Sequence, residues 1–158
     1  MDITLTKIDN DEWDIKRYKS DKLRYYNLYK TEKSKAEYLT FNISKYQRSL
    51  YSQFRCGILP LEIEVGRYRN IELSERLCKL CNMHLVEDEI HFLIDCPLYN
   101  EERKLLFSAK NMSHEAFLQL ESLDKFVYFM SNNEREVITF ISHAFRKRQN
   151  MISYNPTT

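Results

Sequence analysis

Residues 78–97 read CKLCNMHLVEDEIHFLIDCP, a stretch that holds three of the four cysteines of the chain. Cys78 and Cys81 are followed, after nine intervening residues, by His91 and, after four more, by Cys96, a C-x2-C-x9-H-x4-C pattern. Thiolate sulfur and neutral imidazole nitrogen are good ligands for Zn²⁺, and four protein ligands leave no open position for water. The pattern therefore predicts one structural, non-catalytic Zn²⁺ site of zinc-knuckle-like form.

The spacing of the four residues agrees with a single site. Two cysteines three positions apart can bind one ion from a tight turn, and the other pair follows on a separate element. Residues 87–94 read as a short helix whose acidic first turn suits the positive end of the helix dipole, and Pro97 ends it. His91 would project from this helix, and Cys96 would lie just past its last turn.

Other interpretations of these residues remain open from the sequence. Cys78 and Cys81 alone could form a redox pair or serve as two small buried apolar residues. His84 is a competing ligand, although its position close to Cys81 favours a surface histidine or one beside the ligands. Cys56 lies in a helical apolar pattern and is predicted to be a core thiol.

The composition favours helices. The 158 residues include only 2 Gly and 3 Pro, and 30% are charged, which argues against a β-sandwich or a Gly-rich nucleotide-binding fold. We predict a mainly α, small helical domain over residues 16–152, with the zinc segment at 74–103 embedded in it. A loose N-terminal lead-in is expected over residues 1–15 and a disordered tail over residues 153–158.

Apolar periodicity and capping residues place the expected elements. Ser113 is a predicted N-cap, and Ser131 with Glu134 has the capping-box spacing. Residues 59–65 alternate apolar and acidic side chains, which predicts a short extended segment, and residues 66–70 a turn or loop. Helices are expected at 17–37, from 43 to about 57, and at 99–106, 115–120, 123–130 and 134–148.

The formal net charge is only +1, but the charge is unevenly distributed. Residues 1–60 hold 12 Lys or Arg against 8 Asp or Glu, together with seven of the 11 tyrosines. Basic groups beside tyrosines can bind phosphates and stack on unpaired bases, although each could equally be a solvated helix face with its tyrosines in the core. The candidate groups are Lys16, Arg17, Lys19, Lys22 and Arg24 with Tyr25 and Tyr26; Arg67, Tyr68 and Arg69, which directly precede the zinc segment; and Arg146, Lys147 and Arg148.

Several classes of function find no support in the sequence. It contains no Gly-rich phosphate loop, no G-x-S-x-G elbow and no Y-x-D-D polymerase signature, so we predict no enzyme activity and no small-molecule substrate. Glu87, Asp88 and Glu89 are consecutive on a helix and cannot jointly chelate a metal. No apolar run is long enough for a membrane span, and no secretory signal opens the chain. The cysteine usage favours a reducing intracellular location, in the nucleus or the cytoplasm.

The flanks of the cysteine pattern resemble the zinc-binding C-terminal region of non-LTR (LINE-type) retrotransposon reverse transcriptases. The resemblance covers roughly residues 40–150 and is densest over 54–103, including FRCGILPLE at 54–62, RLCKLC at 76–81, VEDEIHFLIDCPLY at 86–99, and Arg103. It implies that Cys78, Cys81, His91 and Cys96 are the metal ligands and that the region helps to bind template RNA or target DNA. The chain lacks the polymerase and endonuclease, so the resemblance implies a truncated or co-opted copy.

Two functional hypotheses from different classes follow. The first is a non-catalytic, zinc-stabilised nucleic-acid-binding module that binds RNA or DNA. The second is a helical protein-interaction module whose zinc site is purely structural and whose docking surface is the apolar face of the 134–148 helix, around Phe140, Ile141 and Phe145. Burial of these three side chains would argue against the second hypothesis. A nuclease is the least supported alternative.

Overall fold

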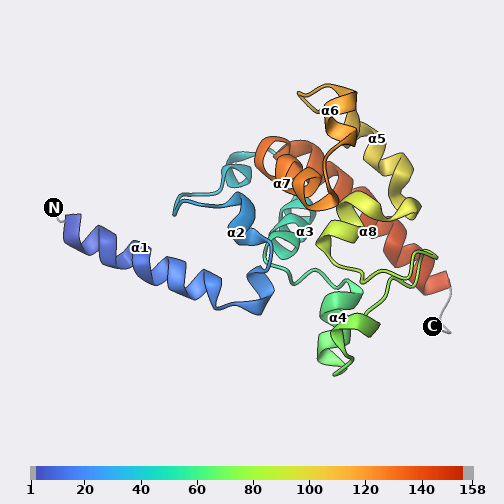
Figure 1. Ribbon diagram of the computed structural model, residues 1–158, viewed down its shortest axis with the longest axis horizontal. Coiled ribbons are helices and arrows are strands. Elements are labelled where there is room, and N and C mark those ends of the chain that lie inside the picture. Colours follow the sequence, from blue (N-terminus) through green and yellow to red (C-terminus); the bar gives the residue numbers. More distant parts are fainter. Residues whose placement is uncertain (1–2, 155–158) are drawn as a thin grey trace.

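A computed structural model describes residues 3–154 of the chain, with side chains described from residue 11 onward. This part is mainly helical, as the sequence predicts (Figure 1), and contains no β-strand, only an isolated antiparallel bridge between Leu77 and Val86. The α-helices are α1 (Ile3–Tyr18), α2 (Tyr26–Tyr29), α3 (Lys45–Arg55), α4 (Glu62–Tyr68), α5 (Asn100–Ser108), α6 (His114–Leu118), α7 (Ser122–Asn132) and α8 (Glu134–Tyr154). Short turns of 3-10 helix lie at Asp21–Leu23, Glu37–Thr40, Leu73–Glu75 and Pro97–Tyr99, and one π-helical turn at His91–Asp95.

Helices α3, α5 and α7 pack around α8, and aromatic rings fill the space between them. Phe92 lies at the centre, with its ring centroid 4.9 Å from that of Tyr99, 5.6 Å from that of Phe140 and 6.0 Å from that of Phe54. Rings at these separations and tilts add about 0.5–1.5 kcal/mol per pair beyond the burial of their area. Since Phe92 follows His91 directly, the core holds the π-helical turn in place.

Helix α3 forms as its sequence predicts. Ser44 and Gln47 make a complete capping box, in which each side chain bonds to the other's backbone N–H. One face of the helix carries buried apolar side chains, among them Leu50 and Phe54. The helix ends before Gly57, whose φ of +64° is a left-handed conformation that glycine adopts without strain.

Replacing Gly57 by alanine is expected to destabilise the protein by at least about 2 kcal/mol, because the left-handed backbone is strained for any L side chain. A Cβ at this position would also lie 1.9 Å from the carbonyl oxygen of Lys22, which is backbone and cannot rotate away. Thermal and urea unfolding measure the loss. Ser131→Ala is the matched control, since Ser131 is exposed within α7; equal stability of both variants would contradict the prediction.

Helix α8 is longer than expected and its apolar face is buried. It continues to Tyr154, so residues 153 and 154 are helical rather than disordered, and residues 155–158 lie outside the described part. Phe140, Ile141 and Phe145 are at most 4% exposed. The proposed docking surface on the 134–148 helix is therefore part of the core. The capping box predicted at Ser131 is also wrong, because Ser131 lies within α7.

Residues 59–65 are not extended, since α4 begins at Glu62 and also takes in most of the predicted 66–70 loop. The alternation of apolar and acidic residues was misleading because both kinds are buried here. Glu62 and Glu64 are 6% and 4% exposed, and each has cationic partners. A strand with one solvent face would leave such carboxylates in water, whereas these lie against other parts of the fold.

The N-terminal third also differs from expectation. Residues 3–18 form helix α1, where a loose lead-in was predicted over residues 1–15, and the guanidinium of Arg17 lies 4.3 Å from the ring centroid of Trp13. The single helix predicted over 17–37 is broken into short turns. The chain folds back because Tyr25 packs against Phe126 of α7, with ring centroids 5.5 Å apart. None of the described helices is long and apolar enough to cross a bilayer.

Candidate metal centre

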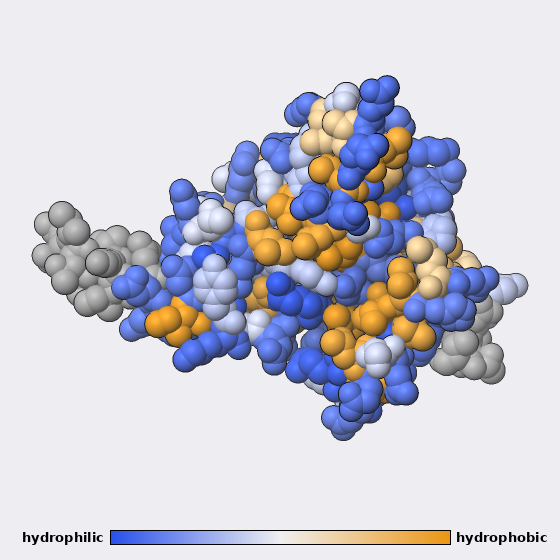
Figure 2. Space-filling view, viewed as in Figure 1, coloured by the Kyte–Doolittle hydropathy of each residue, from blue (hydrophilic) through white to orange (hydrophobic). Residues whose placement is uncertain are grey.

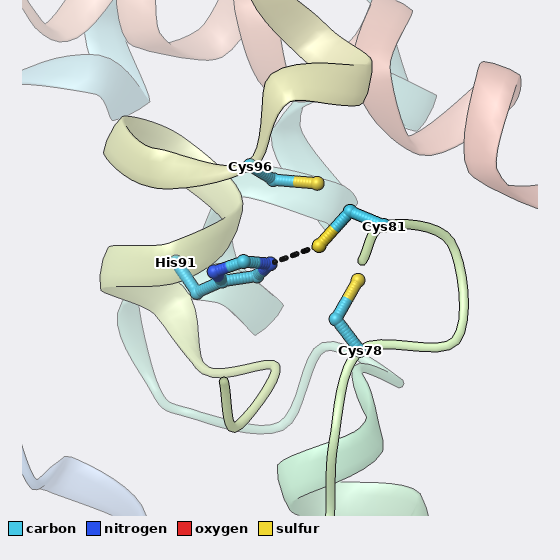
Figure 3. Close-up of side chains that lie close together, drawn as sticks. All are labelled: Cys78, Cys81, His91 and Cys96. Carbon is cyan, nitrogen blue, oxygen red and sulfur yellow. Dashed lines mark hydrogen bonds between the residues drawn. The ribbon is translucent and has the colours of Figure 1, made fainter. Parts of the chain in front are cut away.

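Two neighbouring segments bring the predicted ligands together (Figure 3). Cys78 and Cys81 lie on a turn that is closed by backbone bonds from Cys78 N–H to the Leu85 carbonyl and from Glu87 N–H to the Arg76 carbonyl. His91 comes from the π-helical turn, and Cys96 from the residue after it. The four side chains converge on one point, so the structure groups the same residues as the sequence pattern.

The distances in this group suit a single ion. Its four ligand atoms lie within 4.8 Å of one another, and Sγ of Cys81 is 3.4 Å from Nε2 of His91. Tetrahedral coordination at ordinary Zn–S and Zn–N bond lengths puts ligand atoms about 3.5–3.8 Å apart. Cys78, His91 and Cys96 are buried and Cys81 is half-buried. The Cys3His group could hold a metal ion with little adjustment.

The protonation of the thiols shows how closely they interact. A hydrogen bond to Cys96, followed by burial, raises the pKa of the Cys78 thiol to about 12. The same hydrogen bond lowers the pKa of Cys96, while burial raises that of Cys81. The two shifts are opposite in direction because Cys78 is the donor and Cys96 the acceptor of this hydrogen bond. A divalent cation among the sulfurs would take the place of this shared proton and favour the ionised form of each thiol.

The imidazole of His91 is oriented toward the sulfurs. Nε2 faces Cys81, whereas Nδ1 is buried and has no hydrogen-bond partner among the described residues. The ring is therefore not oriented from behind by a carboxylate or carbonyl, as is common for metal-binding histidines. Contacts at Nε2, together with the helical backbone, hold it in place.

The competing residues are placed elsewhere. His84 is exposed at a positive φ of 55° and does not belong to the group. Cys56 is half-buried at the end of α3, also outside the group, and burial raises the pKa of its thiol. Cys78 and Cys81 are not an isolated pair, because the other two donors face them.

Backbone and side-chain bonds fix the turn that carries His91 and Cys96. The carboxylate of Asp88 accepts a bond from the His91 N–H at 2.8 Å, and the Cys96 N–H donates to the His91 carbonyl at 2.8 Å. Arg103 of α5, which is 3% exposed, donates to the carbonyls of Leu93 and Cys96 at 2.8 Å each. Arg103 therefore positions Cys96. In the sequence, the only sign of this role is that Arg103 belongs to the stretch that carries the family resemblance.

A buried ion pair connects the segment that carries the metal ligands to helix α8. Both oxygens of the Glu87 carboxylate accept bonds from the guanidinium of Arg148, at 2.8 and 2.6 Å, and the two side chains are 1% and 6% exposed. Glu62 of α4 lies 3.5 Å from the same guanidinium and 3.4 Å from Nζ of Lys79, which lies between the two cysteines of the turn. This network connects α8, α4 and the cysteine turn.

Two of the three residues in the third basic group are occupied by contacts within the fold. Arg148 is buried in the ion pair with Glu87, and Lys147 is half-buried with its Nζ bonded to the Leu98 carbonyl and to Glu102. Only Arg146 is exposed, with its guanidinium 6.0 Å from the ring centroid of Tyr46. The sequence pattern missed this because the partners are 45 and 61 residues away.

The first basic group is also largely paired. Arg17 is 5% exposed and pairs with Asp14, Arg24 pairs with Glu89, and Lys22 lies 4.0 Å from Glu64. Most of the N-terminal tyrosines are structural too. Four of them surround the buried guanidinium of Arg55 at 5.1–5.8 Å, namely Tyr26, Tyr29, Tyr38 and Tyr51.

The second basic group remains at the surface, on the C-terminal half of α4. Tyr68 is 70% exposed and Arg69 is exposed without an ion pair among the described residues. Arg67 is held by Glu64 through two bonds of 3.0 and 2.7 Å, and this contact lowers the pKa of the Glu64 carboxyl. Arg67 also lies over the Tyr68 ring, 4.7 Å from its centroid.

The acidic run Glu87, Asp88 and Glu89 is divided among separate partners. Glu87 pairs with Arg148, and Asp88 caps the turn that carries His91 and accepts a bond from Tyr25. Glu89 pairs with Arg24, and burial raises the pKa of its carboxyl to about 7. The three carboxylates do not converge, so they form no second metal group.

Searches for relatives give no further assignment. No protein-family description, curated protein or solved structure matches this chain.

Proposed function

We propose that the chain is a non-catalytic, zinc-stabilised module that binds nucleic acid, with one structural Zn²⁺ held by Cys78, Cys81, His91 and Cys96. The donor chemistry supports zinc, because three cysteine sulfurs and an imidazole suit this ion better than Mg²⁺ or Ca²⁺. Bound Zn²⁺ would act as a crosslink, with all four positions filled by protein. No catalytic role is assigned to it.

The observation that carries the proposal is the set of bonds between the metal segment and α4. The N–H groups of Glu62 and Ile63, at the start of α4, donate to the side chain and the carbonyl of Glu87. Arg76 donates to the carbonyls of Ile63 and Ile71 at 3.0 and 2.9 Å. A metal that orders the segment therefore also orders α4 and the residues at its exposed end.

That exposed end offers the chemistry of nucleic-acid binding. Arg69 can pair with a phosphate, and the free face of Tyr68 can stack on an unpaired base, an interaction worth about 1–3 kcal/mol. In Figure 2 the region around α4 carries both blue and orange side chains. The resemblance to the C-terminal region of LINE-type reverse transcriptases adds support, and we propose that the chain derives from such an element as a truncated or co-opted copy.

Binding to single-stranded RNA tests the proposal. We expect the zinc-loaded protein to bind a fluorescent oligouridylate, with affinity that falls steeply as salt rises, because the contacts release counterions. Replacing Tyr68 and Arg69 together by Leu and Gln should weaken binding about tenfold, equivalent to about 1.4 kcal/mol. Lys104→Gln is the control, since Lys104 is an exposed cation on α5. Absence of salt-sensitive binding by the wild type would overturn the function.

A further inference from the structure

Two stretches of the chain lack acidic residues and come together in the fold. Residues 38–61 and 137–158 contain no Asp or Glu, although the chain has 23 of them. Helix α3 lies in the first stretch and nearly all of α8 in the second, and the two helices pack against each other (Figure 1). Their basic side chains therefore have few local counter-charges.

The cations of these helices point to a shared outer face. On α8, Arg135 and Arg146 are exposed and lie three turns apart, which is about 16 Å along the helix axis. On α3, Lys45 is exposed and Arg48 is half-buried one turn further on. We call these four residues and Tyr46 the α3–α8 face.

Contacts between the helices join the two sets of side chains. The guanidinium of Arg146 lies 6.0 Å from the ring centroid of Tyr46 on α3. Tyr46 is 42% exposed. Arg135 lies 3.9 Å from the ring centroid of Phe41, and Arg48 donates to the Phe41 carbonyl at 3.2 Å. The Nε of Arg48 is buried and has no hydrogen-bond partner among the described residues. Aromatic rings thus hold the two α8 arginines in place without neutralising them.

Few acidic side chains lie beside the α3–α8 face, and two of them already have partners. Glu134, at the start of α8, accepts bonds from Tyr51 and Arg55. Glu102 pairs with Lys147 beside a hollow of about 300 Å³ that His143 and Arg146 also line. Glu136 is half-buried near Arg135 on the first turn of α8. Lys45, Arg135 and Arg146 form no ion pair among the described residues, so the face keeps an excess of positive charge.

We infer that the α3–α8 face binds the phosphate backbone of single-stranded nucleic acid and that Tyr46 stacks on an unpaired base. Guanidinium groups suit phosphate oxygens because of their planar, forked geometry. An exposed ring beside them is the arrangement that proteins use for unpaired bases. This inference rests on the proposed function and adds to it a second contact surface, separate from Tyr68 and Arg69 on α4.

The test compares charge variants of the zinc-loaded full chain by fluorescence anisotropy with oligouridylate. Arg135→Gln with Arg146→Gln should weaken binding about fivefold or more and lower the slope of log affinity against log salt by about 1.4, or 0.7 for each lost phosphate contact. Lys45→Gln with Arg146→Gln should act similarly and leaves the contact of Arg135 with Phe41 intact. Tyr46→Leu should weaken binding with no change of the salt slope. Metal content and thermal midpoint check that each variant folds.

The outcomes separate this inference from the proposed function. If the wild type shows no salt-sensitive binding, both fail. If the wild type binds and the folded variants of the α3–α8 face bind as tightly as Lys104→Gln, this face does not bind nucleic acid. The proposed function then stands without it. Equal binding of oligothymidylate would support a contact to backbone and base planes. Tighter binding of duplex RNA than of either single strand would overturn the assignment to single strands.

Discussion

Cys96→Ser is expected to abolish stoichiometric zinc binding and to unfold much of the domain. Cys96 is fully buried, and its carbonyl accepts one of the bonds that Arg103 donates. Structural Zn²⁺ contributes about 10–16 kcal/mol of apparent binding free energy in small zinc domains, which is comparable to the whole stability of a typical domain. We therefore expect a loss of at least about 5 kcal/mol, or roughly 10–20 °C in the midpoint of thermal unfolding.

Metal analysis by mass spectrometry and thermal unfolding by circular dichroism measure this effect. Cys56→Ser is the matched control, because Cys56 is a half-buried thiol outside the group and should retain one equivalent of zinc. Treatment of the wild type with a chelator should reproduce the loss of stability. A metal-free wild type that unfolds at the same temperature as the zinc-loaded protein would contradict the prediction.

Acidification should weaken metal binding. In the metal-free protein the pKa of Cys78 is raised to about 12, so this thiol is protonated at neutral pH and a metal ion must displace its proton. The affinity for zinc should therefore rise with pH and fall as pH falls, with protons released on binding. Calorimetric titrations in buffers of different ionisation enthalpy would count these protons, and an affinity independent of pH would contradict the prediction.

Glu87→Gln is expected to destabilise the protein by about 3–5 kcal/mol, because it removes the carboxylate that binds the buried guanidinium of Arg148 through two bonds and leaves only Glu62, 3.5 Å away. The same change weakens the bond that the Glu62 N–H donates to the Glu87 carboxylate. Replacing both residues, Glu87→Gln with Arg148→Met, should cost less than the sum of the single changes, since no charge remains unpaired. Urea unfolding of the four proteins of this cycle measures the coupling.

Glu101→Gln supplies the comparison for an exposed pair. Glu101 and Lys104 are paired at 2.6 Å, but their side chains are 73% and 71% exposed, so solvent screens the interaction and its loss should be within about 1 kcal/mol. If Glu87→Gln behaved like Glu101→Gln, the pair with Arg148 would not be buried in solution. That result would contradict the claim that this ion pair connects α8 to the metal segment.

The strongly patterned helices could be predicted from local sequence. Helix α3 carries its own capping box and a buried stripe, and Ser113 caps α6 as expected by accepting a bond from the Ala116 N–H. These signals are local, because a cap and an apolar stripe act within a few residues of the helix. Helix α4 was missed because its alternating pattern resembles that of a strand. The burial of Glu62 is tolerable because Lys79 and Arg148, far along the chain, lie against it, whereas Glu64 pairs with Arg67 one turn along the same helix.

The basic groups also show which features local sequence predicts and which depend on distant contacts. Runs of Lys and Arg are visible in the sequence, but their availability depends on partners far along the chain. Arg148 and Arg146 are two residues apart, yet one is buried against Glu87 and the other is exposed beside Tyr46. On a helix, positions two apart point in different directions, so one of two neighbouring arginines can face the core.

The sequence by itself determined the helical class and the four residues of the candidate metal group, because few Gly and Pro, local apolar periodicity and donor spacing act over short distances. Tertiary structure alone decided which charges are buried and which are free. A carboxylate or guanidinium can leave water only where an opposite charge meets it, and in this protein such pairs join residues up to 79 positions apart.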